Sequence, residues 1–394
     1  MIWHSLTNIM KKTLIITMVL AFAFSMSLPA LATTNVISTG LIQDQGGSGV
    51  APIVKAKWEM NSTRETTSPY GYLGTDDSTA DGAQFNPTGV KDVDRVITLC
   101  AIVTDGDGLS DINGVYADVY YPTDQTQNNA PIDLGPSHVK LSTQSGLECG
   151  LLMQEDTMTR LTKDEGIALF CNKIRNGNNN LPTFNTVPMT YTYDEICKTD
   201  GELMKETAYV ACVDKHLSYE DASGMYKVTA LVQDVANLNG TLDNQFEYLP
   251  LTAFETDFSS VNYGNVKLNT NKIIIGDLTW DNGIASVRNI GNTRMNLQVM
   301  QDDMGLDKTS GNWNVRYDAR VGSVVAHQNY YPDALTTLDD ALDLSEMDEV
   351  DFSILVNKFP SSQSTNWTGT MTLSAVEAGH LCCDGSPAGE CFSE

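Results

Sequence analysis

The chain has 394 residues, which is long enough for two or three domains with separate hydrophobic cores. Its formal net charge is −26, because 50 acidic residues face only 24 Lys and Arg. Nucleic acids and anionic lipid surfaces bind basic patches, so this charge excludes both as main partners. It fits a protein kept soluble by charge repulsion, or one whose carboxylates bind divalent cations.

Residues 1–32 have the pattern of a secretory signal peptide, with a short basic segment, an apolar run and an A-x-A cleavage site ending at Ala32. We expect export, a mature chain that begins near Thr33, and no transmembrane anchor once the signal is removed. A retained membrane anchor is the alternative, although the apolar run is short for a span. Residues 33–50 resemble a flexible leader with a Gly/Ser-rich end.

Residues 51–250 are predicted to form a β-sandwich domain. Strand patterns begin at 51–60, and 92–122 contains two strands around a tight Asp/Gly turn. From Tyr226 onward, apolar and polar side chains alternate, which indicates a half-buried antiparallel strand. The region at about 145–206 instead has helix-forming residues, an acidic first turn and a glycine stop, which predicts a helical insertion within the domain.

Eight cysteines in an exported chain indicate disulfides rather than metal or redox sites. Five lie in the first domain and three in the tail: Cys100, Cys149, Cys171, Cys197 and Cys212, then Cys382, Cys383 and Cys391. Both groups are odd, so either one bridge joins the two regions or two thiols remain for bonds between chains. We expect Cys171–Cys197 to staple the insertion, although spacing alone leaves the connectivity open. A zinc site around His380 is the alternative in the tail, but its spacing matches no standard zinc motif.

Residues 251–378 are predicted to form a second β-sandwich, followed by a Cys-rich tail at 379–394. The strands are short, turns are frequent, and no long helical pattern alternates with them, which favours a sandwich over a parallel sheet. In the last strand we expect one set of side chains to face inward, namely Trp367, Met371, Leu373 and Ala375, and Thr370, Thr372 and Ser374 to face outward.

The motif Asp-x-x-Gly-x-Tyr, ending at Tyr226, resembles the tyrosine corner of immunoglobulin-like sandwiches, in which the Tyr hydroxyl bonds back to the backbone. Val228 stands where an antibody domain has its second cysteine, so a true antibody domain is excluded. Residues 96–119 resemble the B-strand, turn and C-strand of exported immunoglobulin-like repeats, without the usual strand-C tryptophan.

Two motifs of the second half resemble another recurring exported module. Residues 286–299 carry an Asn-x-Gly-Asn corner between two strands, and Trp367 begins an aromatic-x-Gly-Thr entry into a closing strand. Such modules occur in tandem in archaeal and bacterial cell-surface proteins. The resemblance therefore implies a mainly β chain with two immunoglobulin-like antiparallel sandwiches and a role at the cell surface.

The turn D-G-D-G-L-S-D places Asp105, Asp107 and Asp111 around two glycines. Calcium needs several oxygen ligands on a sharply turning backbone, and this spacing supplies part of such a set. Relative to an EF-hand loop, the first acid and the closing Glu are missing, so other ligands must come from carbonyls, Asn113 or another loop. The alternative is an ordinary hairpin turn, since turns are rich in Asp and Gly.

Three Asn-x-Ser/Thr triplets, at Asn61, Asn239 and Asn366, match the N-glycosylation acceptor pattern, although a chain rich in Asn and Thr also forms them by chance. No catalytic residue is predicted. The chain lacks the G-x-S-x-G, P-loop, dinucleotide and metalloprotease motifs, and paired acids are too frequent to single out a glycosidase pair.

Together these features predict a non-enzymatic, extracellular or cell-surface protein with a structural or adhesive role. It would be a subunit of an envelope layer such as an S-layer, a sheath or a filament, and would associate with itself or with other envelope proteins. One alternative is a soluble carbohydrate- or peptide-binding protein that stacks sugars on exposed aromatics at Tyr120, Tyr121, Tyr330 and Tyr331. Another is an extracellular hydrolase with acids on loops. No cofactor is expected, with calcium at the Asp105 turn as the alternative.

Overall fold

The computed structural model describes residues 49–61, 78–79, 82–121, 138–139, 143–144, 147–148, 151–176, 182–361 and 366–378. Within them the chain is mainly β, and its helices gather in one segment. The predicted signal peptide, nearly all of the leader and the Cys-rich tail lie outside these residues. Buried hydrophobic side chains form two clusters, one drawn almost entirely from residues 54–248 and the other from 263–356.

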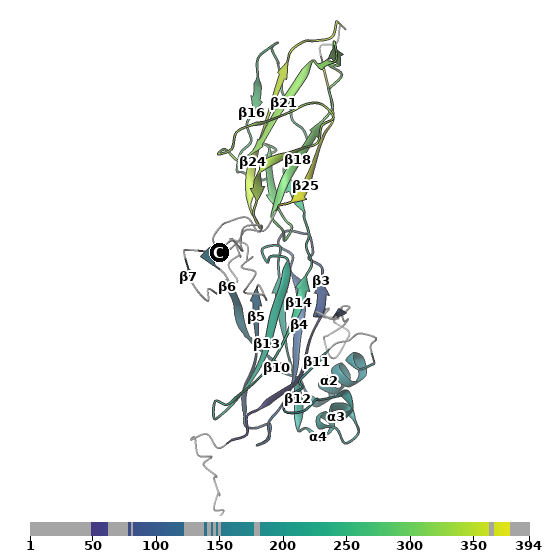
Figure 1. Ribbon diagram of the computed structural model, residues 1–394, viewed down its shortest axis with the longest axis vertical. Coiled ribbons are helices and arrows are strands. Elements are labelled where there is room, and N and C mark those ends of the chain that lie inside the picture. The colour runs from purple at the N-terminus through teal and green to yellow at the C-terminus, as the bar shows by residue number, and fades with distance from the viewer. Residues whose placement is uncertain are drawn as a thin grey trace, which may run out of the picture. The chain divides into compact units, whose positions relative to one another are not determined.

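Two main sheets build the first half of the chain (Figure 1). One contains, in spatial order, β10 (Thr159–Arg160), β12 (Ala208–Leu217), β4 (Arg95–Thr104), β1 (Ile53–Asn61) and β11 (Thr183–Phe184). The other contains β2 (Ser78–Thr79), β3 (Gly82–Phe85), β14 (Asn239–Tyr248), β13 (Gly224–Asp234), β5 (Ile112–Tyr121), β9 (Leu151–Thr157) and β6 (His138–Val139), and β7 (Thr143–Gln144) pairs separately with β8 (Leu147–Glu148). Among the described pairs of this half, β3 runs parallel to β14 and the others are antiparallel, a departure from the expected all-antiparallel pattern.

Strands β4 and β5 do not form a hairpin. Strand β4 pairs with β1 on one side and with β12 on the other, so both of its edges are taken. Strand β5 pairs instead with β13 and β9 in the second sheet. The Asp/Gly turn at 105–111 is therefore a crossover between two sheets, and its interpretation as an ordinary hairpin turn is wrong.

The helices are α2 (Lys163–Gly166), η2 (Ile167–Ile174, wound as a π-helix), α3 (Tyr193–Cys197) and α4 (Glu202–Lys205). Thr162 caps α2 in a capping box with Glu165, at the position where the acidic first turn predicted a start. Residues 151–160, which the sequence placed in the helical insertion, are strands β9 and β10, because the free edge of β5 provides a ladder for β9. None of the helices in the described residues is long and apolar enough to cross a membrane.

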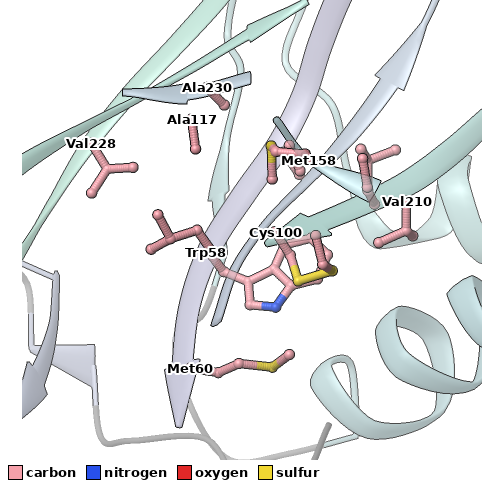
Figure 2. Close-up of a cluster of buried hydrophobic side chains, with 14 of the residues drawn as sticks. Trp58, Met60, Cys100, Ala117, Met158, Val210, Val228 and Ala230 are labelled. Atoms are coloured by element: carbon pink, nitrogen blue, oxygen red, sulfur yellow. A yellow bond between two sulfur atoms is a disulfide. The ribbon is translucent and has the colours of Figure 1, made fainter. Parts of the chain in front are cut away.

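A row of three residues runs across the first sheet inside the core. Trp58, Cys100 and Cys212 are direct neighbours on β1, β4 and β12, and the two cysteines form a disulfide. Figure 2 shows the Trp58 indole beside the sulfur of Cys100. The Trp58 ring also lies 5.1 Å from the ring of Phe170 on η2, so it joins the sheet to the helices. An aromatic ring thus covers a buried disulfide without a tryptophan on β5.

The second half also contains two main sheets. One has the order β15 (Phe254–Thr256), β17 (Ser286–Asn289), β24 (Met347–Val356), β21 (Val315–Val321) and β22 (Gln328–Tyr330), with β16 (Lys272–Ile274) also paired to β24. The other has the order β23 (Thr336–Leu342), β18 (Met295–Gln301) and β25 (Met371–Glu377), and a short hairpin joins β19 (Lys308–Thr309) to β20 (Asn312–Trp313). Met371, Leu373 and Ala375 of β25 pack against the second cluster and Thr372 is exposed, which is the expected alternation.

The Asn-x-Gly-Asn corner holds the chain that connects the two strand sets. The buried side chain of Asn292 accepts a hydrogen bond from the Leu251 N–H at 2.7 Å and donates one to the Leu249 carbonyl at 3.0 Å. Asn289 donates to the Thr293 carbonyl at 2.8 Å and closes the corner itself. The motif therefore satisfies backbone groups that no strand ladder reaches.

Candidate functional site

The three acids predicted as cation ligands lie together in the crossover between β4 and β5. One side-chain oxygen from each of Asp105, Asp107 and Asp111 lies within 4.8 Å of the other two. The loop backbone holds them there, since the Asp107 N–H donates to Asp105 Oδ1 at 2.8 Å and the Asp111 N–H donates to the Gly108 carbonyl at 2.9 Å. Asn113, which the sequence offered as a further ligand, is exposed and outside this group.

Burial raises the pKa of the Asp105 carboxyl, and the nearby charges of Asp111, Asp107 and Asp234 raise it further. The Asp107 N–H that donates to Asp105 acts in the opposite direction. Asp234 is a fourth acid that sequence reasoning missed. The available signal was its place at the end of an alternating strand, shortly before Asn237, a residue type common in turns.

The aromatic residues predicted to stack on sugars differ in their exposure to solvent. Tyr330 is only 2% exposed and its ring packs 5.4 Å from that of Tyr317 in the second core, so the expectation that it stacks on a sugar is wrong. Tyr331 is 54% exposed. Tyr330 is the last residue of β22, whereas Tyr331 lies just beyond the strand, before a turn. The side chains of Tyr120 and Tyr121 lie outside the described part of the chain.

The structure also places the three predicted glycosylation acceptors and some of the remaining cysteines. Asn239 and Asn366 are exposed, whereas Asn61 ends β1 and its side-chain oxygen accepts a hydrogen bond from Arg95. Cys171 and Cys197 form the expected disulfide, with an S–S distance of 2.01 Å, which joins η2 to α3. Outside the described residues lie Cys149, Cys382, Cys383 and Cys391.

A cleft of about 1170 Å³ opens in the second strand set. Four segments line it: Phe258–Val266, residues of 301–306, residues of 354–359, and residues of 366–373. The lining side chains are aromatic, aliphatic, amide or hydroxyl groups, and none of them carries a charge. The chain as a whole has a net charge of −26, so the uncharged lining of this cleft differs from the acidic character of the rest of the protein.

Aromatic rings form part of the wall of this cleft. The rings of Phe359 and Trp367 lie 6.3 Å apart at 24° to each other, and both residues line the cleft. The Tyr263 hydroxyl donates to Gln301 Oε1 at 3.2 Å, and burial raises the pKa of Tyr263, which keeps it neutral. The cleft therefore offers flat apolar faces beside neutral hydrogen-bonding groups.

Asp302 holds the segment that carries Trp367. Its carboxylate accepts hydrogen bonds from the Met304 N–H at 3.0 Å and the Thr370 N–H at 2.8 Å. A Cβ at Gly369 would lie 2.1 Å from Asp302 Oδ1, closer than atoms can approach. The aromatic-x-Gly-Thr motif thus has a steric reason for its glycine, because the chain must pass directly over this carboxylate.

Strand β25 borders the cleft and, within the described residues, pairs only with β18. Met371 and Leu373 of β25 line the cleft, whereas Thr372 between them is exposed on the other face. A strand with a partner on one side presents backbone groups to an added strand, and its alternate side chains form pockets. The residues that line the cleft include no acid, histidine or cysteine.

No protein-family model matches the chain, and no curated protein matches it in sequence. Among solved structures, the chain is similar to a chaperone–tip adhesin complex of CFA/I fimbriae biogenesis, with 9% identity over 85% of this chain and 92% of the other and a TM-score of 0.21. It is also similar to the C-terminal domain of the Streptococcus pyogenes antigen I/II-family protein AspA (12% identity, 83% and 95% covered, TM-score 0.21). The Streptococcus agalactiae AgI/II polypeptide BspA C-terminal domain gives 10% identity, 83% and 96% covered, and a TM-score of 0.18. These low scores do not identify a function.

Proposed function

We propose that this chain is an exported, non-enzymatic protein of the cell surface with a structural or adhesive role. In this proposal the cleft beside β25 binds an extended, uncharged segment of a partner polypeptide, either another envelope protein or a second copy. The observation that carries the proposal is the uncharged lining of the cleft directly beside the edge strand β25. Two buried disulfides support export, because such bonds persist in oxidising compartments.

The acidic surface of the protein and the uncharged lining of the cleft together favour neutral ligands. The acidic surface repels acidic partners, and an uncharged cleft does not compensate a buried charge, so a charged segment would lose its hydration without gaining an ion pair. An extended neutral segment loses little, since its backbone bonds to β25 and its alternate side chains occupy the space near Met371 and Leu373.

A neutral carbohydrate is the second candidate ligand. The faces of Trp367 and Phe359 lie in the cleft with Gln301 and Asn262 nearby, and sugars bind by stacking on such faces while amides bond to their hydroxyls. The edge strand favours the peptide, because a sugar makes no use of a free strand edge.

Two variants of β25 test the proposal. Met371→Glu places a charge in the cleft, and Thr372→Glu places the same charge on the exposed face one residue away. Purified protein is screened against a library of extended ten-residue peptides and a glycan array. We expect selected peptides to be neutral and apolar, and Met371→Glu to weaken their binding at least tenfold while Thr372→Glu leaves it unchanged.

Three results would contradict the proposal or redirect it. Peptide binding that both variants retain would remove the cleft as the binding site. Glycan binding that is lost in Trp367→Ala, without any peptide binding, would favour the carbohydrate alternative. Turnover of a polysaccharide or peptide that one acid-to-amide change abolishes would overturn the non-enzymatic role and support the hydrolase. Thermal melting of each variant checks that it is folded.

A further inference from the structure

We infer that the crossover between β4 and β5 binds one calcium ion through the carboxylates of Asp105, Asp107 and Asp111. Asp234 supplies a further negative charge next to this site. The inference is independent of the cleft in the second strand set and concerns the first set alone. It stands on three observations among the residues that the structure describes: the convergence of the three acids, the buried oxygens that lack partners, and the absence of an ion pair to a basic residue.

The acids converge without a basic partner. One oxygen from each of Asp105, Asp107 and Asp111 lies within 4.8 Å of the others. In the part of the chain that the structure describes, no ion pair joins any of them, or Asp234, to a Lys, Arg or His. Like charges this close repel one another, so the folded loop needs a cation or bound protons.

Buried carboxylate oxygens without hydrogen-bond partners point to the same conclusion. Asp105 is 7% exposed, Asp111 is 9% exposed and Asp234 is fully buried. Oδ2 of each of these three residues has no hydrogen-bond partner within the described residues. Leaving such oxygens buried and unsatisfied is costly, and a cation among them removes that cost.

Asp234 lies at a different turn, the one between β13 and β14, and its carboxylate adds a further negative charge near the site. Its Oδ1 accepts the Leu238 N–H at 2.7 Å, which fixes the turn between β13 and β14 and leaves Oδ2 available. The next residue, Val235, donates its N–H to the Asp111 carbonyl at 2.9 Å, so this turn lies against the crossover. Asp234 is not within the 4.8 Å group, and we therefore assign it to the surroundings of the ion.

The donor set selects calcium among common metals. All three proposed ligands are carboxylates, and the group contains no His or Cys, which excludes the nitrogen and sulfur sets that zinc and copper prefer. Calcium accepts six to eight oxygens in irregular geometry, with carbonyls and water completing the shell, and it suits a turning loop better than the strict octahedron of magnesium.

Calcium bound here would fix three parts of the chain at once. The ligands span the crossover from one sheet to the other, and Val235 ties that crossover to the β13–β14 turn. Asp107 Oδ2 also accepts the Val50 N–H at 2.7 Å, which anchors the chain just before β1. Losing the ion would therefore loosen the entry into β1 together with the crossover.

Calcium titration of the metal-free protein tests the inference. We expect isothermal titration calorimetry to show one calcium per chain, terbium luminescence to rise on binding, and magnesium to compete weakly. Calcium at one hundred times its Kd should raise the melting temperature of the first strand set by about 5–10 °C over the EDTA-treated protein. Asp111→Asn should weaken calcium binding at least tenfold and remove most of that thermal shift.

A matched control is Asp281→Asn, which removes the same charge from an exposed turn of the second strand set and should leave calcium binding unchanged. If Asp111→Asn fails to fold, the calorimetry, luminescence and melting of the wild-type protein still test whether calcium binds. A wild-type protein with no calorimetric heat, no terbium signal and the same melting temperature in calcium and in EDTA would overturn the inference. Equal weakening by both variants would assign the effect to net charge and would also overturn it.

Discussion

The hydroxyl of Tyr226 donates a hydrogen bond of 2.6 Å to the carbonyl oxygen of Ala222, four residues before it. Both residues are fully buried, and the Tyr226 ring stacks on Phe246 with the ring centres 5.0 Å apart. This is the geometry of a tyrosine corner, in which a side chain satisfies a carbonyl that the strand ladder leaves free. The hydrogen bond therefore fixes the chain just before β13 to the first residues of that strand.

Replacing Tyr226 by Phe should reduce the free energy of unfolding by about 1–2 kcal/mol, because it leaves the Ala222 carbonyl buried with its bond lost. Tyr219→Phe is the matched control. The Tyr219 hydroxyl reaches Asp92 at a long 3.4 Å, and Asp92 is exposed to water, so this change should cost less than about 0.5 kcal/mol. Urea unfolding of both variants gives the comparison, and equal losses would remove the special role of the corner.

The two disulfides should differ in their contribution to stability. Cys100–Cys212 closes a separation of 112 residues and Cys171–Cys197 one of 26. The chain-entropy model predicts stabilisation of about 4.8 and about 3.5 kcal/mol for these separations. Replacing each pair by alanines and measuring urea unfolding should therefore show the larger loss for Cys100 and Cys212, enlarged further by the space left beside Trp58. The reverse order would show that strain or residual structure outweighs chain entropy.

Gly369 and Asp302 should be energetically coupled. Gly369→Ala forces a methyl group against Asp302 Oδ1 and should cost about 1–3 kcal/mol. Asp302→Ala loses the bonds to the Met304 and Thr370 N–H groups and should cost about 1–2 kcal/mol. In the double variant the clash with the Asp302 carboxylate is gone and only the 2.7 Å approach to Met304 Cγ remains, so the combined loss should be smaller than the sum. A double-mutant cycle measures this, and strict additivity would refute the steric explanation.

Local patterns in the sequence predicted the features that short stretches of chain determine. The tyrosine corner, the start of α2 after Thr162 and the inward face of β25 each depend on residues less than ten positions apart. The grouping of the three acids was predicted for the same reason, since Asp105 and Asp111 lie in one turn. Alternation and capping are local effects, so one stretch of sequence carries them.

Features that depend on distant partners were missed. The sequence did not show that β4 and β5 belong to different sheets, because that follows from the pairing of β4 with β1 and β12. The cleft joins Phe258–Val266 to Trp367, segments about one hundred residues apart, and Asp234 reaches the crossover only after the sheet has formed. Residues 151–157 became a strand because β5 had a free edge, and residues 159–160 because they pair with β12; both are tertiary effects that override local propensity.

A pH-dependent contribution to stability is expected from Asp340 on β23. Partial burial raises the pKa of Asp340, and the nearby carboxylates of Asp348 and Asp343 raise it further, while Arg294 and the Ala341 N–H lower it. The folded state then binds the proton more tightly than the unfolded state. Protonated Asp340 therefore stabilises the fold fully below the ordinary aspartate pKa. This stabilisation is lost as the pH rises through the raised pKa of the folded state, and at neutral pH the ionised carboxylate destabilises the fold.

Asp340→Asn should accordingly stabilise the protein at pH 7, by about 0.5 kcal/mol or less because solvent screens a partly exposed group. The same variant should have no effect at about pH 2.5, well below the ordinary aspartate pKa, where the carboxyl is protonated in both states. Asp339→Asn is the control, since this exposed neighbour on the opposite face of β23 removes an equal charge. Urea unfolding at both pH values decides the matter: a gain at pH 7 that Asp339→Asn reproduces would assign the effect to net charge rather than to the environment of Asp340.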